Sequence, residues 1–269
     1  VAGVLYYRQQ RRLKMGGPRM VHKKQVIAVC GGSCRPPCTL PKMGDNESER
    51  NSATWLGDFG MSTVPGKELT SGFFRMNKGN ALEYTYTYEE LKLILDGEFH
   101  LTDGTGQRVV AKAGDLMYFP KGSKIIFDTP FTALGYFCGQ RKAGEGAMPE
   151  PCPAELAAAI ASNPRMVHHP EVMTRPLEKM TGNESEKNSA TWLSDFGFSL
   201  GTAPMTSGFF RMNKGNALEY TYTYEELKLI IDGEFHLTDG TGQFVVAKAG
   251  DLMYFPKGAK ITFDTPNTA

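Results

Sequence analysis

Residues 83–107 read EYTYTYEELKLILDGEFHLTDGTGQ, and residues 219–243 repeat this stretch with the single change of Leu95 to Ile231. Alternating tyrosines and threonines, followed by an aliphatic run, are typical of β-strands. The Asp-Gly and Asp-Gly-Thr-Gly steps are typical of tight turns between antiparallel strands. The stretch therefore predicts consecutive antiparallel strands, and it predicts them twice in one chain.

The duplication extends well beyond this stretch. NESERNSATWLGDFG at Asn46 returns with two changes at Asn183, and SGFFRMNKGNALEYTYTYEELKL at Ser71 returns unchanged at Ser207. VVAKAGDLMYFPKG and PRMVH are also present in both halves. The period is 136 residues, from Ser71 to Ser207. Such a period is too long for a solenoid repeat and matches two whole domains.

These repeats predict the domain organisation. We expect a basic arm with the start of the first repeat at 1–44, a first domain at 45–140 and a second at 167–269. The linker, 141–166, contains PAELAAAIASNP, which is typical of a short helix with Pro and Glu at its start and Asn-Pro at its end. The first repeat continues with ALGYFCG, a closing strand, where the second stops at Ala269. Either the second domain is truncated there or another segment closes it.

Composition limits the classes of function. The 30 basic and 29 acidic side chains give a net charge of +1, which does not support nucleic-acid binding. No apolar run is long enough for a transmembrane helix, so we expect a soluble protein. The arm before Gly44 has no acidic residue, and it is interpreted as a solvated arm, an organelle-targeting segment or an anchor to a protein assembly.

The five cysteines do not suggest a disulfide framework, and a reducing compartment is expected. Cys30, Cys34 and Cys38 follow one another at equal spacing, but a metal site would need a fourth ligand. The second repeat has no counterpart of this triplet. We therefore interpret these residues as loop thiols.

Two motifs resemble the cupin family. EELKLILDGEFHL resembles the first cupin motif, with Glu90 at the position of the glutamate metal ligand. AKAGDLMYFPKGSKIIF resembles the second, with Gly114, Asp115, Pro120 and Gly122 at its marker positions. The sequences of these two motifs are especially similar to those of the EutQ-like cupins of ethanolamine utilisation. The resemblance implies an all-β fold of two tandem cupin barrels (double-stranded β-helix, jelly-roll) joined by a linker with a short helix.

The sequence departs from the cupin pattern at the histidine ligands. Their positions fall on Tyr84, Tyr86 and Ile125 in the first repeat, and the second repeat has Tyr220, Tyr222 and Ile261 there. Neutral phenols and one glutamate do not replace imidazoles as transition-metal ligands, so we predict neither a metal nor a cofactor. EutQ-like proteins have been linked to acetate kinase activity, but neither GTGQ nor GEGA continues as a phosphate-binding loop.

Strand periodicity places one set of side chains on the face of the family glutamate, and this face should line the barrel. The predicted ligand-binding residues are Tyr84, Tyr86, Tyr88, Glu90 and Lys92, with Tyr220, Tyr222, Tyr224, Glu226 and Lys228 in the second repeat. The catalytic candidates among them are Glu90, Lys92 and Tyr86, with Glu226, Lys228 and Tyr222. A buried Glu and Lys need each other as partners.

Three functions remain open at this point. The leading one is the binding of an unidentified small molecule in two near-identical barrels. The second is metal-independent lyase or isomerase chemistry that uses the glutamate with its tyrosine and lysine neighbours. The third is an accessory or structural subunit of a larger assembly. Apart from these functions, the tyrosines could simply fill the barrel around a buried ion pair.

Overall fold

The computed structural model describes residues 18–26, 28–30, 33–35, 40–62, 64–65, 68–144, 154–199 and 204–269. Strands make up most of its secondary structure and every pair of named strands given in register is antiparallel, which confirms the all-β prediction. The greater part of the basic arm lies outside the described residues, as do Cys38 and Cys152.

The chain divides into two compact units. The unit that we call the first-repeat unit consists of the described residues within Val26–Glu178 and Leu193–Phe210. The second-repeat unit consists of those within Val1–Gln25, Lys179–Trp192 and Arg211–Ala269. The segment 18–25 thus belongs to the second-repeat unit, although it precedes the first repeat in the sequence.

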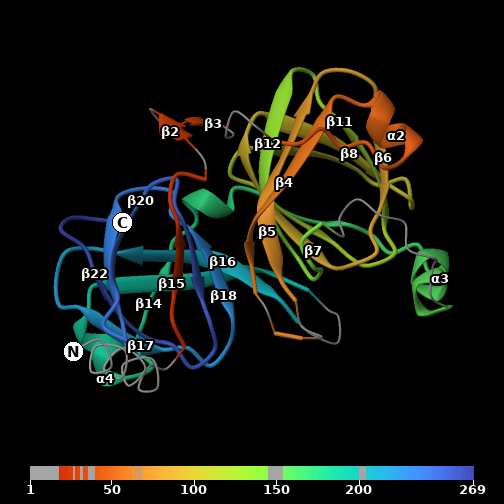
Figure 1. Cartoon of the computed structure of the whole chain (residues 1–269). Coiled ribbons are helices and arrows are strands. Elements are labelled where there is room, and N and C mark those ends of the chain that lie inside the picture. Colours follow the sequence, from red (N-terminus) through yellow and green to blue (C-terminus); the bar gives the residue numbers. More distant parts are fainter. Residues whose placement is uncertain are drawn as a thin grey trace, which may run out of the picture. The chain divides into compact units, whose positions relative to one another are not determined.

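Two sheets face each other in the first-repeat unit (Figure 1). One has six strands in the order β13-β10-β7-β12-β5-β4, with bounds Val167–His169, Leu116–Phe119, Glu90–Asp96, Thr132–Gly139, Thr70–Asn77 and Thr54–Met61. The other has four in the order β6-β11-β8-β9, with bounds Leu82–Thr85, Lys124–Asp128, Glu98–Asp103 and Arg108–Lys112. The closing strand expected from ALGYFCG is β12, which lies between β7 and β5.

An aromatic core fills the space between these sheets. Phe74 stacks on Phe99 with ring centroids 5.5 Å apart, and Phe127 contacts Phe74, Phe99 and Phe119. All four rings are at most 2% exposed. Burial of such side chains stabilises by roughly 1.5–3 kcal/mol each. The barrel interior is therefore packed except where polar side chains enter it.

Glycine permits close strand contact at one position of the six-stranded sheet. A Cβ at Gly72 would lie 1.9 Å from the carbonyl oxygen of Gly57 on the neighbouring strand β4. No side chain fits there, so Gly72 allows β4 and β5 to pair along their length.

The second-repeat unit repeats much of this architecture. Its four-stranded sheet has the order β17-β22-β19-β20, with bounds Leu218–Thr221, Lys260–Asp264, Glu234–Asp239 and Phe244–Lys248. A three-stranded sheet has the order β1-β21-β18, with bounds Val21–Lys23, Leu252–Phe255 and Glu226–Leu229.

The remaining strands and helices are short. A three-stranded sheet joins β14 (Glu178–Lys179), β15 (Thr191–Phe198) and β16 (Thr206–Met212), and β2 (Ala28–Cys30) pairs with β3 (Ser33–Arg35). Cys30 and Cys34, expected in a loop, thus lie on strands. The helices are α2 (Glu47–Asn51), α3 (Ala154–Ala161) and α4 (Glu184–Asn188), with a 3-10 turn η2 at Val172–Thr174.

The helices α2 and α4 were not predicted, whereas α3 confirms the helix expected in the linker. Both missed helices start in the repeated NESE sequence. Asn46 and Asn183 cap them by accepting from the backbone N–H of Glu49 and Glu186, which is an N-cap signal in the sequence. Each helix spans one turn and a half, so periodicity alone does not reveal it.

The expectation of one regular strand over the tyrosines is wrong in one respect. The chain leaves strand β6 after Thr85 and enters β7 only at Glu90, so residues 86–89 form a turn-like connection. A turn of this kind does not preserve strict two-residue alternation, and the sequence contained no Gly or Pro to mark it.

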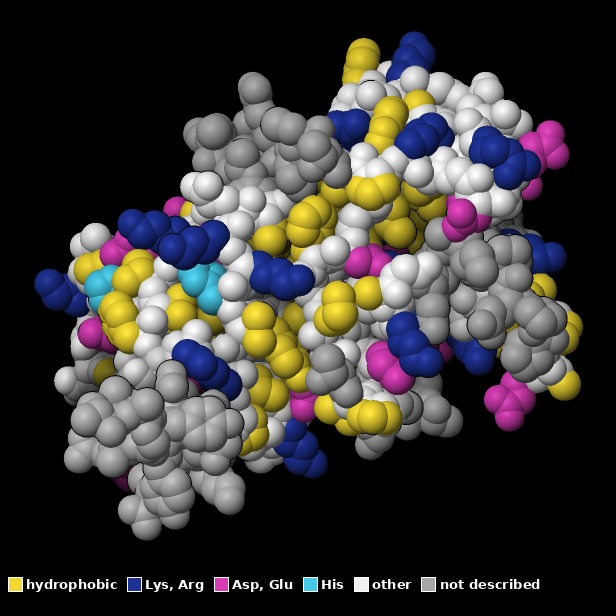
Figure 2. Space-filling model, viewed as in Figure 1, with side chains coloured by type: hydrophobic (Ala, Val, Ile, Leu, Met, Phe, Trp, Pro, Cys, Tyr) yellow, Lys and Arg dark blue, Asp and Glu magenta, His cyan; other side chains and the backbone are white. Residues whose placement is uncertain are grey.

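None of the helices among the described residues is long and apolar enough to cross a membrane. On the face shown in Figure 2, Lys and Arg side chains are scattered among Asp and Glu.

Candidate functional site

The tyrosine stretch and the start of β7 bring the predicted residues of the first repeat together in one place. Tyr84 is on β6, Tyr86 and Tyr88 are in the connection, and Glu90 and Lys92 are on β7. The backbone N–H of Tyr86 donates to the Ser123 carbonyl at 2.9 Å, and its carbonyl accepts from the Gly122 N–H at 2.8 Å. The second cupin motif thus fixes the connection in place.

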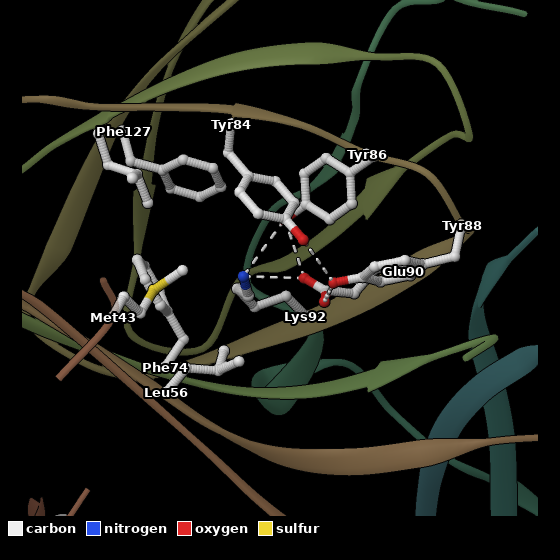
Figure 3. Close-up of a pocket in the computed structure, with 10 residues that line it drawn as sticks. Met43, Leu56, Phe74, Tyr84, Tyr86, Tyr88, Glu90, Lys92 and Phe127 are labelled. Carbon is white, nitrogen blue, oxygen red and sulfur yellow. Dashed lines mark hydrogen bonds and ion pairs between the residues drawn. The ribbon is translucent and has the colours of Figure 1, made fainter. Parts of the chain in front are cut away.

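Glu90 and Lys92 form a buried ion pair, as the sequence reasoning required. The Lys92 Nζ lies 2.8 Å from Glu90 Oε1, and the two side chains are 4% and 2% exposed. Tyr86 donates to Glu90 Oε1 at 2.9 Å, and Tyr88 lies 3.4 Å from Oε2. Figure 3 shows these polar atoms converging from three tyrosines toward the pair.

Aromatic rings enclose the Lys92 ammonium on its other sides. Its Nζ lies 4.6 Å from the ring centroid of Phe74, 5.1 Å from that of Phe127 and 5.4 Å from that of Phe119. These are distances at which a cation is attracted to a ring. Burial lowers the pKa of Lys92, and the Glu90 carboxylate opposes this effect. The ammonium therefore depends on Glu90 and the rings to remain charged.

The tyrosines are neutral phenols. Burial, followed by the charge of Glu90, raises the pKa of Tyr86 well above 10, and burial does the same for Tyr88. Burial also raises the pKa of Tyr84. Tyr84 and Tyr88 hydroxyl oxygens are 3.2 Å apart. Each phenol can therefore donate one hydrogen bond and accept another, but none supplies a negative charge near pH 7.

A small cavity lies beside these polar groups. Its volume is about 20 Å³ and it is lined by Met43, Leu56, Phe74, Leu82, Tyr84, Tyr86, Tyr88, Glu90, Lys92 and Phe127. A cavity needs roughly 10–15 Å³ to hold a water molecule, so this space suits a molecule of about that size. A ligand as large as an aromatic ring would require the side chains to move.

The cavity's donor set does not fit a transition-metal ion, which cupins often hold at this place. Such an ion takes imidazole, thiolate or carboxylate ligands. Both Glu90 oxygens already accept hydrogen bonds from phenols, and Ile125, at the position of the third histidine, is a buried apolar residue. Across the part of the chain that the structure describes, no three His, Cys, Asp or Glu side chains are grouped as a metal site requires.

Sequence reasoning missed Arg141, which lies beside Tyr88. Its guanidinium binds both carboxylate oxygens of Asp58, at 2.7 and 2.8 Å, and lies 5.4 Å from the ring centroid of Tyr88. Burial would lower the pKa of Arg141, but the hydrogen bonds to Asp58 and the nearby charges raise it. Its position just after the closing strand was the only signal in the sequence.

The second-repeat site has the same residues in a more open setting. Lys228 Nζ lies 2.8 Å from Glu226 Oε1, and the side chains are 15% and 23% exposed. Tyr222 is buried and stacks on Phe255 with centroids 5.0 Å apart, whereas Tyr224 is 46% exposed. Tyr220 and Tyr224 hydroxyl oxygens are 3.2 Å apart, as in the first repeat. Both sets of predicted residues are thus brought together.

Comparison with known proteins supports a single family. A family model described as ethanolamine utilisation protein EutQ matches residues 57–137 and 162–269. A curated relative from Salmonella typhimurium, described as acetate kinase EutQ, is 38% identical over 65 residues, which is 24% of this chain and 28% of the relative. One from Clostridioides difficile, with the same description, is 32% identical over 89 residues, or 33% of this chain and 54% of the relative. The chain thus spans about a quarter to about half of the length of these relatives.

Solved structures with low sequence identity share the fold. Protein YlbA from E. coli has a TM-score of 0.55 and 11% identity, and the alignment covers 96% of this chain and 94% of that one. A cupin 2 conserved barrel domain protein from Leptotrichia buccalis has a TM-score of 0.52 and 9% identity, with 80% and 85% covered. Oxalate decarboxylase from Bacillus subtilis has a TM-score of 0.52 and 14% identity, with 81% and 70% covered. These likenesses establish two tandem cupin barrels and nothing about chemistry.

Proposed function

The chain belongs to the family described as ethanolamine utilisation protein EutQ, and on this premise we propose that it is a metal-free bicupin that binds a small, uncharged polar molecule in its barrels. The observation that carries the proposal is the cavity beside Glu90, Lys92 and the three tyrosines. In this cavity a ligand can accept from a phenol and donate to a carboxylate.

The charge state of the site indicates the class of ligand. Glu90 and Lys92 neutralise each other, and the tyrosines are neutral. A charged ligand would add an unpaired charge to a buried site, which is costly. The volume limits the ligand to a few heavy atoms, since about 20 Å³ is available. Short alcohols and amides meet the charge condition, and they are the smallest organic molecules that carry the required donors and acceptors, so they need the least movement of the lining side chains.

The test is a titration of protein with ¹³C-labelled tyrosine rings, using ethanol, formamide and acetamide as probes. Saturable shifts of the Tyr86 and Tyr88 signals, reduced at least tenfold in affinity by Glu90→Gln, would support the proposal. Glu234→Gln, at a partly exposed pair with His236 outside the site, is the control. Equal affinities of the wild type and Glu90→Gln for every probe that binds would contradict a role of the carboxylate.

The metal-free part of the proposal has its own test. Elemental analysis of untagged protein, purified without chelators, should give far less than one transition-metal ion per chain. One or two tightly held ions per chain would overturn our interpretation of the tyrosine positions. That outcome would restore a metal centre of the kind cupins commonly hold.

A second candidate function is metal-independent proton transfer in a lyase or isomerase. It is favoured by the short distance between Lys92, Glu90 and Tyr86, and by the lowered pKa of the buried lysine. The test is exchange of solvent deuterium next to the carbonyl of small ketones and aldehydes, followed by NMR. Exchange that is lost in Glu90→Gln supports this function. Binding of the same carbonyl compounds without exchange leaves only the binding function.

The acetate kinase activity in the relatives' description would require a site for nucleotide phosphates. The glycine-containing turn after β8 does not offer one, because Asp103 already accepts from the backbone N–H groups of Thr105 and Gln107 at 2.9 Å. The other glycine-containing stretch, GEGA from Gly144, extends beyond the described residues. The proposal of an accessory subunit depends on the basic arm, which lies mostly outside them as well.

A further inference from the structure

The sequence Pro-Arg-Met-Val-His appears twice, and each copy adds a strand to the edge of a barrel sheet. The first copy, 18–22, leads into β1, which pairs antiparallel with β21 in the second-repeat unit. The second copy, 164–168, leads into β13, which pairs antiparallel with β10 in the first-repeat unit. This is the geometry by which proteins bind extended peptides at a sheet edge.

The register of the two added strands is the same. His22 lies opposite Met253 and His168 opposite Met117, which are equivalent positions of the two repeats. The methionine before each strand, Met20 or Met166, is 2% exposed and anchors its segment in the barrel core. Identical register and an identical anchor show that one binding mode has been used twice.

Three side chains of each barrel hold the segment. In the first-repeat unit, Asp103 accepts from the Met166 N–H at 3.2 Å, Gln107 accepts from Arg165 Nε at 2.9 Å, and Asp115 lies 2.8 Å from His168 Nε2. The equivalent contacts in the second-repeat unit are those of Met20 with Asp239 (3.2 Å), Arg19 with Gln243, and His22 with Asp251 (2.8 Å).

The contacts continue to the end of each segment. Asp115 accepts from the Glu171 N–H at 2.8 Å, and Asp251 accepts from the Gln25 N–H at 2.6 Å. Glu171 and Gln25 share a positive φ, of 54° and 46° respectively. The same bend thus brings the same amide to the same carboxylate in both units, although the residue types differ at this position.

Each segment is bound by the barrel of the other repeat. The copy at 164–168 precedes the second repeat but lies in the first-repeat unit, and the copy at 18–22 precedes the first repeat but lies in the second-repeat unit. The first-repeat barrel does not bind the copy that precedes the first repeat, and the second-repeat barrel does not bind the copy that precedes the second repeat. For the copy at 18–22, nearness along the chain does not decide the pairing, because this copy lies closer in sequence to β10 than to β21, with which it pairs.

We propose that strand β21 with Asp239, Gln243 and Asp251 is a binding site for an extended Arg-Met-Val-His peptide, and that it also accepts this strand from a second copy of the chain. We call this site the strand dock. Its own segment competes at a high effective concentration because it belongs to the same chain, so exchange with a second copy requires that segment to leave. The strand dock is separate from the tyrosine cavity, and the two proposals stand independently.

The first experiment uses the full chain with Met20→Asp, which places a charge on the buried anchor and releases the segment. A fluorescently labelled peptide with the sequence of residues 18–25 is the probe. We expect saturable binding to this variant, at least tenfold tighter than to the wild type, whose dock is filled. A control peptide with Asp in place of Met and Ala in place of His should bind at least tenfold more weakly.

Adding Asp251→Asn to the Met20→Asp chain should reduce affinity for the matched peptide to that of the control peptide. Circular dichroism verifies that each variant is folded. If Met20→Asp does not fold, Arg19→Ala with His22→Ala removes two contacts but keeps the anchor, and it is tested in the same way. Equal binding of matched and control peptides to a folded variant with its segment released would overturn the proposal.

The second experiment tests acceptance from another copy. A tagged Met20→Asp chain, which has an open dock, is mixed with an untagged Asp239→Asn, Asp251→Asn chain, which has a free segment. We expect the tagged chain to capture the untagged variant at least tenfold more efficiently than it captures the untagged wild type. Equal capture of both would restrict the strand dock to its own chain and refute the exchange between copies.

Discussion

The buried ion pair between Glu90 and Lys92 leads to a quantitative prediction for Lys92→Met. The two charged atoms are 2.8 Å apart, and at an effective dielectric constant of about 20 their attraction is about 6 kcal/mol before desolvation is counted. Methionine removes the ammonium and leaves the carboxylate buried with only phenols as partners. Removal of one member of such a pair costs about 3–5 kcal/mol. We expect a loss of this size in the first-repeat unit.

The second repeat supplies a matched control, because Lys228→Met removes the same side chain from the same sequence context. The Glu226 and Lys228 side chains are 23% and 15% exposed, so water screens the charge that remains. Partly exposed pairs contribute much less, and we expect a loss of about 1 kcal/mol. The double variant Glu90→Gln, Lys92→Met should recover most of the loss at the buried site, since it leaves no unpaired charge.

The two tryptophans allow each unit to be followed separately. Trp55 lies in the first-repeat unit and Trp192 in the second-repeat unit, so Trp192→Phe or Trp55→Phe leaves one reporter. With a urea dependence of about 2 kcal/mol per M, Lys92→Met should lower the Trp55 midpoint by about 2 M. Lys228→Met should lower the Trp192 midpoint by about 0.5 M. Equal shifts, or a double variant no more stable than Lys92→Met, would refute the argument from burial.

Three further predictions concern the surroundings of the site. Burial would raise the pKa of Asp115, but hydrogen bonds from Glu171, Lys112 and His168 hold this pKa below its ordinary value. The ionised Asp115 therefore stabilises the folded protein above a pH of about 4. This stabilisation is lost as the pH falls through the lowered pKa that Asp115 has in the folded protein. Hydrogen exchange of 164–171, corrected for intrinsic rates, should accelerate in that acidic window, and unchanged protection there would contradict the prediction. Cys138 is partly exposed, but burial of its thiol and the charge of Glu90 raise its pKa to about 12. The thiol is therefore protonated at pH 8, and iodoacetamide should modify it far more slowly in the native protein than after denaturation. Peptide mapping measures both rates, and equal rates would contradict the prediction. Gly122 and Gly106 both have positive φ, but a Cβ at Gly122 would lie 2.5 Å from the backbone of α3, whereas Gly106 faces open space. In urea unfolding, Gly106→Ala should lower the free energy of unfolding by about 1–2 kcal/mol, and Gly122→Ala should lower it clearly more. Equal losses would indicate that α3 moves away freely.

Much of the fold could be predicted from the sequence because its signals are local and repeated. Strand residues, turn glycines and two motifs specify consecutive antiparallel strands, and those strands are present. The crossing of the Pro-Arg-Met-Val-His segments could not be predicted in this way. Both copies look alike, and sequence alone does not show which barrel a segment binds. Only the register with β21 and β10 reveals it.

The candidate site was predicted in composition but not in size. Alternation placed Glu90 and the tyrosines on one face, and they do converge, although residues 86–89 are not a strand. The cavity volume depends on side chains from distant segments, such as Met43, Phe74 and Phe127. Periodicity along one stretch contains no information about how closely such side chains approach from elsewhere. Sequence reasoning therefore left a ligand pocket and a filled barrel as equal alternatives.

The two sites show that the motif alone does not determine the properties of the site. The same tyrosines, glutamate and lysine give a pair at most 4% exposed in one repeat and a pair at least 15% exposed in the other. In the first-repeat unit, β12 brings Phe137 to 6.0 Å from the Lys92 ammonium, and Arg141, the second residue after this strand, pairs with Asp58. Phe137 on β12 thus joins Phe74, Phe119 and Phe127 around the Lys92 ammonium.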